Sequence, residues 1–247
     1  MASSFTSEKL MEAVRFPFED KKWVEKLFIA AVMLIGSFLI IPALFYMGYS
    51  YELQRRMIVD GEKPSLPEWD NWGTYLKNGF KMIAVQIIYT LPYLIVVLPI
   101  LFSFLFLLIK SAVSENPAPY FLPIPVLMIL LGVVTVFGYP LILVIKAAQG
   151  RLIATGSFEE ALHLSEVWLI FRSNLGGYVL TFVLYMAATY VVSFVAQIMI
   201  YTIILIIVVP FFLYPLSLYL SLAADAMFAR AYIESRERIR NEEESED

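Results

Sequence analysis

The sequence predicts an all-α membrane protein: a polytopic bundle of about five transmembrane helices, with two interfacial amphipathic elbow helices and an internal repeat. Of the 247 residues, 60% are hydrophobic and only 16% are charged, whereas about one quarter of the residues in a soluble domain are charged. The charges gather in short stretches between long apolar runs. This pattern is typical of a chain that passes alternately through lipid and water.

Long apolar runs define the predicted spans. The first run, residues 27–48, is long enough to cross about 30 Å of hydrocarbon at 1.5 Å per residue. The last apolar region, residues 178–224, is too long for one helix, and we divide it near residues 197–202, where Gln197 and Thr202 are among the few polar residues. The predicted spans are therefore residues 27–48, 82–109, 121–145 and the two parts of 178–224.

Two short amphipathic segments follow the first and third spans and are predicted to be elbow helices. The first opens with Ser65-Leu-Pro-Glu68 and the second with Ser157-Phe-Glu-Glu160, which is the spacing of a capping box. Both end in an Asn/Gly turn before a returning span. We therefore predict a repeat with halves at about 27–110 and 121–232. Prolines that fall late in alternate spans add to the pattern: Pro42, Pro140 and Pro215.

The charge distribution predicts domain limits and orientation. Residues 1–26 form an amphipathic N-terminal segment, residues 27–232 the transmembrane domain, and residues 233–247 a charged tail predicted to be disordered. With five spans, twelve basic residues lie on the face that carries the C-terminus and six on the other. The positive-inside rule then predicts a multi-pass protein of the cell membrane with a cytoplasmic C-terminus. If the first span is a re-entrant hairpin, both termini are cytoplasmic.

Asp225 is the most informative single residue, because it lies within an apolar segment of the last span. A carboxylate at membrane depth is costly unless it is paired or faces water. Its candidate partners are Arg230 at the same helix end, or Lys146 and Arg151 at the matching end of the third span. We interpret Asp225 as half of an ion pair that locks the spans together. A coupling-ion or proton site is the functional alternative.

The first elbow carries four candidate docking residues. Trp69 and Trp72 bear indole rings, which favour the headgroup level of a membrane. Glu68 and Asp70 form the polar face of the same segment. The simpler interpretation is an elbow that anchors the fold at the interface. The alternative is a docking surface for a protein partner or a lipid headgroup.

The second elbow holds His163, the only histidine, and Trp168. Glu159, Glu160 and Glu166 lie within one helical turn of His163, a spacing that could bring an imidazole and two carboxylates together. A metal site needs more ligands and a supporting shell. We therefore interpret these residues as solvated charges or a partner-docking face, and we predict no metal.

Several classes of chemistry have no support in the sequence. The chain has no cysteine, which excludes disulfides, thiolate zinc sites and iron–sulfur clusters. It contains no phosphate-binding loop, zinc-protease helix or nucleophile elbow. A formal charge of −4 gives no case for nucleic-acid binding. We predict a non-enzymatic protein without cofactors.

Three stretches resemble a known family of bacterial and archaeal integral membrane proteins, the domain-of-unknown-function 4013 family. They are Phe45-Tyr-Met-Gly-Tyr-Ser-Tyr51, Gly61-Glu-Lys-Pro-Ser-Leu-Pro-Glu-Trp-Asp-Asn-Trp-Gly73 and Phe158-Glu-Glu-Ala-Leu-His-Leu-Ser-Glu166. The resemblance covers residues 16–232 and implies no catalytic or binding residue, because that family has no assigned activity. The chain is also distantly similar to the membrane domain of some glycerophosphodiester phosphodiesterases, but it lacks their soluble catalytic domain.

These observations lead to two predicted functions. The first is a non-enzymatic membrane module, surrounded by membrane lipid, that forms a homo-oligomer or binds another membrane protein. The aromatic elbows, the charged tail and the lack of a chemistry-bearing cluster favour it. The second is a small transporter or lipid-handling protein, favoured by the repeat, the proline-containing spans and Asp225.

Overall fold

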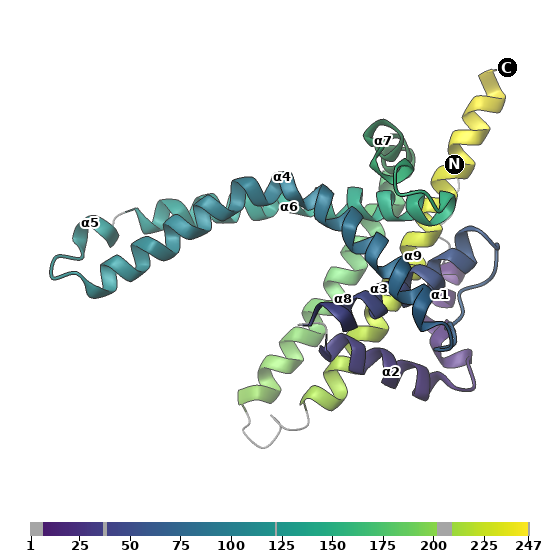
Figure 1. The fold of residues 1–247 in the computed structure, drawn as a ribbon, viewed down its shortest axis with the longest axis horizontal. Helices are drawn as coiled ribbons and strands as arrows, with labels where there is room; N and C mark the ends of the chain where they lie inside the picture. The colour runs from purple at the N-terminus through teal and green to yellow at the C-terminus, as the bar shows by residue number, and fades with distance from the viewer. Residues whose placement is uncertain (1–6, 37–38, 122, 202–208, 247) are drawn as a thin grey trace. The chain divides into compact units, whose positions relative to one another are not determined.

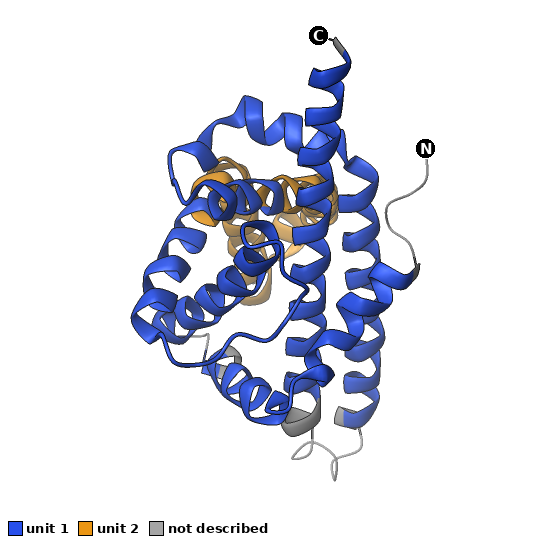
Figure 2. Cartoon of the chain, turned by 90° about the vertical axis from the view of Figure 1, so that its right-hand side faces the viewer, with its two compact units in different colours: residues 1–85, 146–247 blue, residues 86–145 orange. Residues whose placement is uncertain are grey.

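The structure is a computed structural model that describes residues 7–36, 39–121, 123–201 and 209–246, and every regular element in these ranges is a helix (Figure 1). The predicted all-α class is therefore confirmed. The chain divides into two compact units (Figure 2): unit 1 comprises residues 1–85 and 146–247, and unit 2 comprises residues 86–145. The described helical stretches that are long and apolar enough to cross a membrane are Trp72–Val113, Ala118–Thr155 and Leu175–Met199.

Unit 1 begins with α1 (Ser7–Glu19), α2 (Trp23–Ile35) and α3 (Ile40–Ile58). The prediction of one continuous span over residues 27–48 is wrong, because α2 ends and α3 begins inside it; residues 37 and 38 lie outside the described residues. Gly36 weakens a helix by about 1 kcal/mol relative to alanine. Pro42 lies in the first turn of α3, where its missing N–H breaks no helical hydrogen bond. Pro42 therefore lies at the start of a helix and not near the end of a span.

The first predicted elbow, residues 65–78, is not a separate helix. Residues 60–71 are irregular, and α4 (Trp72–Val113) begins at Trp72 and continues through the second predicted span. Side chains of α2, α3 and α4 hydrogen-bond the carbonyls of the irregular segment: Lys26 Nζ to Leu66 (3.0 Å), Tyr49 Oη to Pro67 (3.2 Å) and Tyr75 Oη to Glu68. These bonds satisfy three carbonyl groups of the irregular segment, and Pro67 has no N–H to donate within a helix. The predicted capping box at Ser65 therefore does not form.

The second predicted elbow contains two short helices. After α5 (Ala118–Phe121), helix α6 (Ile124–Thr155) leads to the 3-10 helix η2 (Glu160–Leu162), α7 (Leu164–Ser173) and α8 (Leu175–Tyr201). Here one half of the predicted capping box forms, because the Glu160 amide donates to Ser157 Oγ at 3.4 Å. Helix α7 buries Val167 and Ile170 and exposes Trp168. Its location at a membrane interface stays a prediction.

Helix α9 (Val209–Glu246) is the central element of unit 1, because α1, α2, α3, α7 and α8 all pack against it. Leu218 and Leu222 are fully buried and fill the core. Ala226 and Ala229 are also fully buried, and their small side chains let neighbouring helices approach closely. The predicted division of the last apolar region near residues 197–202 stays a prediction, because residues 202–208 lie outside the described residues.

The charged tail is helical as far as Glu246, so the prediction of disorder for residues 233–247 is wrong over the part that the structure describes. Its charges are mixed in sign from Glu234 to Arg240, and those that follow are all acidic. Arg240 lies 3.8 Å from Glu244, one turn further on, which is the spacing of a helix-supporting pair. Ile239 is buried within unit 1 and anchors this part of α9.

Unit 2 consists of the later part of α4, the short helix α5 and the earlier part of α6. The hydroxyl of Tyr93 on α4 lies beside Gly138 on α6, 3.0 Å from the position of an added Cβ. More than half of the large apolar side chains of the unit are exposed on its surface. Its buried residues, among those described, are Tyr89, Ile124, Leu143 and Ile145.

The predicted repeat and its halves, 27–110 and 121–232, stay a prediction. Each half crosses a boundary between the two compact units. One local likeness agrees with a repeat: Gly61 and Gly156 both have φ of 68° and both follow the helix that precedes an elbow segment. Only glycine adopts this left-handed conformation readily, so both chain reversals depend on it.

Candidate functional site

The candidate site is a polar network centred on Asp225, which is only 4% exposed on α9. Ser50 of α3 donates a hydrogen bond to Asp225 Oδ2 at 2.6 Å. Lys146 of α6 donates to Asp225 Oδ1 at 2.8 Å and forms an ion pair with it. The carboxylate therefore joins three helices that are far apart in the sequence.

The network continues along α3 and α9. Gln54 donates to Ser50 Oγ at 3.1 Å, and Tyr46 donates to Ser221 Oγ at 2.7 Å. Tyr46, Ser50 and Gln54 are spaced four residues apart, so they share one face of α3. Ser221 and Asp225 share a face of α9 in the same way. A polar stripe thus lies between two helices whose other contacts are apolar.

Pairing makes the burial of this carboxylate energetically acceptable. An isolated buried charge is expensive, and a partner offsets much of that cost when further hydrogen bonds complete the geometry. Lys146 keeps 24% of its side chain exposed and lies 5.4 Å from the ring centroid of Phe228. The Asp225–Lys146 ion pair and the Ser50 hydrogen bond together form an interhelical clasp, that is, a polar contact that fixes the register of α3, α6 and α9.

Two buried polar groups, on α6 and α8, lack a hydrogen-bond partner among the described residues: Gln149 Oε1 and Thr181 Oγ1. Gln149 is 2% exposed and follows Lys146 by three residues on α6, while Thr181 is fully buried on α8. Buried polar groups without a protein partner are usually hydrogen-bonded to water.

The structure selects one of the three predicted partners of Asp225. Lys146 is the partner, whereas Arg230 pairs with Glu12 of α1 and donates to the carbonyl of Lys9 at 2.6 Å. Arg151 pairs with Glu160 and lies 3.5 Å from Glu166. These three cations do not form one site. Arg230 attaches α1 to α9, and Arg151 attaches α6 to the second elbow.

The two tryptophans of the first elbow, predicted to anchor it at the interface or to dock a partner, pack within unit 1. Trp69 stacks on Tyr49, with ring centroids 4.2 Å apart and planes 7° apart, and its Nε1 donates to the Lys26 carbonyl at 3.1 Å. Trp72 contacts Phe45 edge to face at 5.2 Å and is 38% exposed. This aromatic cluster holds the irregular segment 60–71 against α2 and α3, so Trp69 serves the fold.

The acidic residues of the first elbow differ from each other. Glu68 lies 2.8 Å from Lys26 Nζ, which also contacts Asp20 at 2.6 Å. Asp70 is exposed. Lys26 is buried and bridges two carboxylates at the turn between α1 and α2, a contact that the sequence pattern did not suggest.

The second elbow presents its candidate residues to solvent. The side chain of His163 is 51% exposed and lies 3.8 Å from Glu160 Oε2, and Trp168 is 56% exposed. Among the described residues, no group of three or more histidine, aspartate or glutamate side chains could hold a metal ion.

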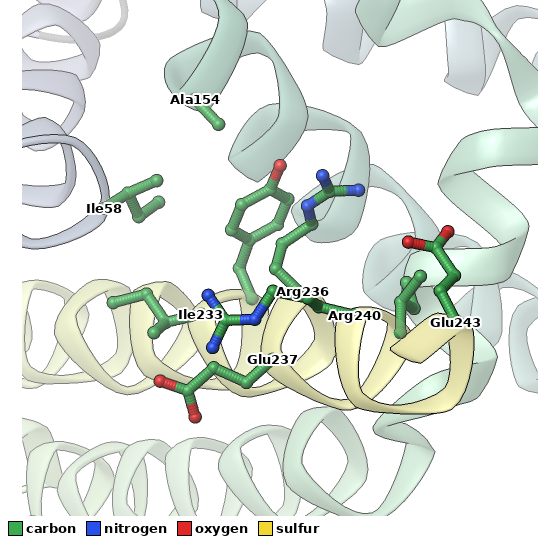
Figure 3. A pocket seen from close by; sticks show the side chains of 9 residues that line it. Ile58, Ala154, Ile233, Arg236, Glu237, Arg240 and Glu243 are labelled. Atoms are coloured by element: carbon green, nitrogen blue, oxygen red, sulfur yellow. The ribbon is translucent and has the colours of Figure 1, made fainter. Parts of the chain in front are cut away.

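A pocket of about 450 Å³ lies beside the C-terminal part of α9, between Ile58 of α3 and Ala154 of α6 (Figure 3). Its charged lining residues alternate in sign along α9: Arg236, Glu237, Arg240 and Glu243. The opposite charges balance, so the pocket favours neither an anionic nor a cationic ligand. It therefore adds no ligand class to the candidate site.

In the part of the chain that the structure describes, three helical stretches are long and apolar enough to cross a membrane, and an ion pair joins α6 and α9. The family model described as "Protein of unknown function (DUF4013)" matches residues 35–201, and the chain belongs to that family. Ser50 and Lys146 lie inside the matched range and Asp225 beyond it. No curated protein and no solved structure matches the chain. The distant similarity to glycerophosphodiester phosphodiesterase membrane domains stays a prediction.

Proposed function

We propose that this protein is a non-enzymatic membrane module that associates through unit 2 with a second copy of itself or with another membrane protein. The observation that carries the proposal is the composition of unit 2. It presents two long apolar helices and buries few of its own side chains. No motif in the sequence supports catalysis, and the polar network of unit 1 has the geometry of a helix clasp.

Helix association in a bilayer depends on close approach, because lipid tails are as apolar as leucine and supply no hydrophobic drive between helices. Small residues therefore favour contact. Gly132 and Thr135 lie three residues apart on one side of α6, and both are exposed. An added Cβ at Gly132 would meet no atom within 4 Å. The hydroxyl of Thr135 is bonded to the Leu131 carbonyl at 2.7 Å, so this face presents small, satisfied groups to a neighbouring helix.

The test is native mass spectrometry of the protein extracted from its own membrane in a mild detergent. We expect a fixed homo-oligomer or a stoichiometric second protein, and we expect Gly132→Leu to dissociate it without changing the thermal stability of the chain. Val133→Leu is the matched control: Val133 is the next residue, it is exposed, and its side chain is already bulky, so leucine adds little volume there. A wild-type protein that is monomeric and free of protein partners contradicts the proposal, and so does a Gly132→Leu variant that stays assembled.

The proposed topology places both termini in the cytoplasm. Helix α2 has 13 residues and spans about 20 Å, which is less than the hydrocarbon thickness. The α2–α3 pair therefore suits the re-entrant alternative. The contact between Glu12 and Arg230 supports the same topology, because it holds α1 beside the part of α9 that precedes the charged tail. Single cysteines introduced at Glu8 and Glu243 should react with an impermeant maleimide only after the cells are permeabilised.

A second candidate function is a small transporter with Asp225 as a proton site. The observations that favour it are the buried carboxylate of Asp225 and two further buried polar side chains, Gln149 and Thr181, whose oxygens have no hydrogen-bond partner among the described residues. Proton flux into vesicles that contain a pH-sensitive dye tests it. The double variant Asp225→Leu/Lys146→Met keeps side-chain volume but removes both charges. Loss of flux in this folded variant supports transport, and equal flux in both proteins contradicts it.

A further inference from the structure

A groove of about 590 Å³ lies in unit 1 between α1, α8 and α9. Helix α1 packs against α2 and α9, and the groove separates it from α8. The groove walls are almost entirely apolar and include Leu10, Met11 and Val14 of α1, Leu184 and Ala188 of α8, and Ala223 of α9.

The groove offers few directional partners to a polar guest. Tyr219 contributes a ring to the wall, but its hydroxyl donates to the Val14 carbonyl at 2.7 Å and is therefore occupied. This bond also fixes α1 against α9, so the groove keeps its shape. A guest in this groove must gain its binding energy from apolar contact.

The groove borders a candidate membrane span. Helix α8 is a candidate span, and only 6% of its apolar window is buried within the chain. The volume is in the range of small-molecule pockets, about 300–1,000 Å³. A flexible hydrocarbon chain suits an apolar groove that is formed by three helices.

A positive charge lies on the same face of α1 as the groove. Arg15 follows Met11 by four residues, which places both on one side of the helix. Arg15 is exposed and forms no ion pair with any described residue. A guanidinium binds phosphate oxygens through parallel N–H donors. The groove and Arg15 together match an acyl chain followed by a phosphate headgroup.

We propose that this groove binds one membrane phospholipid, with an acyl chain between α1 and α8 and its phosphate on Arg15. The site lies wholly in unit 1 and is independent of association through unit 2. The bound lipid fills the space between the amphipathic N-terminal helix and a membrane span. It thereby couples the position of α1 to the surrounding bilayer.

Native mass spectrometry in a mild detergent, with phosphatidylglycerol as the added probe, tests the site. We expect the wild-type protein to carry one phospholipid, identified by its mass. Ala188→Trp should lower the lipid-bound fraction about tenfold because the indole fills the groove. The matched control is Ala187→Trp, which places the same ring on the next, exposed position outside the groove and should keep the lipid.

Arg15→Gln is the second variant, because it leaves the groove walls intact and cannot fail by overpacking. We expect it to lower the lipid-bound fraction with no change in the thermal midpoint. A wild-type protein that carries only detergent overturns the proposal. Equal lipid retention by Ala188→Trp and Ala187→Trp also overturns it, as does full retention by Arg15→Gln. Gly132→Leu should keep the lipid, so failure of this proposal is distinguishable from failure of the association through unit 2.

Discussion

Gly48 and Gly79 of unit 1 differ from Gly132 of unit 2 in the space around them. In unit 1, an added Cβ at Gly48 would lie 1.9 Å from the Tyr75 carbonyl oxygen, and one at Gly79 would lie 1.8 Å from the Leu44 carbonyl oxygen. These two glycines let the backbones of α3 and α4 touch. In unit 2, an added Cβ at Gly132 meets nothing within 4 Å. Gly48 and Gly79 therefore serve a close contact within unit 1, whereas the position of Gly132 in unit 2 is open.

The two units also differ in how their structure is specified. Unit 1 uses directional groups, such as the Asp225–Lys146 pair and the Trp69–Tyr49 stack, to fix one arrangement of its helices. Unit 2 relies on apolar helices whose backbone hydrogen bonds are satisfied within each helix. In a bilayer such helices are stable individually and find partners afterwards. Substitutions in unit 1 should therefore change folding, and those in unit 2 should change association.

The largest expected effect comes from breaking the ion pair of unit 1. Asp225→Leu leaves Lys146 without its carboxylate, and we expect the free energy of unfolding to fall by about 3 kcal/mol. The double variant Asp225→Leu/Lys146→Met removes both charges and should recover most of that loss. Denaturation of detergent-solubilised protein, followed by circular dichroism, measures both. If Asp225→Leu alone is as stable as the wild type, the pair does not clasp the helices.

A smaller effect is expected where α3 and α4 touch. Gly48→Ala forces the two backbones apart, and we expect a loss of about 2 kcal/mol, because overpacking a close contact displaces the neighbouring chain. Gly132→Ala is the matched control in unit 2 and should leave the stability unchanged or slightly raised, since alanine favours a helix. Thermal unfolding of both variants gives the comparison. Equal destabilisation by the two substitutions would contradict the distinction between the units.

The sequence predicts the helical class and the membrane character because both depend on apolar composition over long windows. It also predicts a charged partner for Asp225, since a buried carboxylate needs one. It could not choose Lys146 over Arg230, because that choice depends on how α1 lies against α9. The stripe of Tyr46, Ser50 and Gln54 was detectable from its four-residue spacing, but only packing against α9 gives it a role.

The predictions from the sequence were wrong where tertiary contacts override local preferences. The first elbow reads as a capped helix from Ser65, but carbonyl contacts to Lys26, Tyr49 and Tyr75 hold it in an irregular form. The first predicted span reads as one apolar run, because the break near Gly36 costs little locally and is stabilised by packing of α2 and α3 on α9. These contacts join residues that are far apart in the sequence, so local sequence patterns do not predict them.

The smallest expected effect concerns the turn between α1 and α2, where unit 1 adds a charge contact outside the membrane spans. Burial raises the pKa of Asp20, but the hydrogen bond and charge of Lys26, with the amide of Lys22, outweigh it and hold the pKa below its ordinary value of 3.8. A carboxyl whose pKa is lowered by folding stabilises the folded state above pH 3.8, and this contribution disappears as the pH falls through the lower, folded-state pKa. Asp20→Asn should therefore cost about 1 kcal/mol at pH 7 and nothing at the acidic end. Unfolding of both proteins between pH 7 and strong acid measures the difference in their free energies of unfolding. If that difference does not vanish in acid, Asp20 acts through its shape and not through its charge.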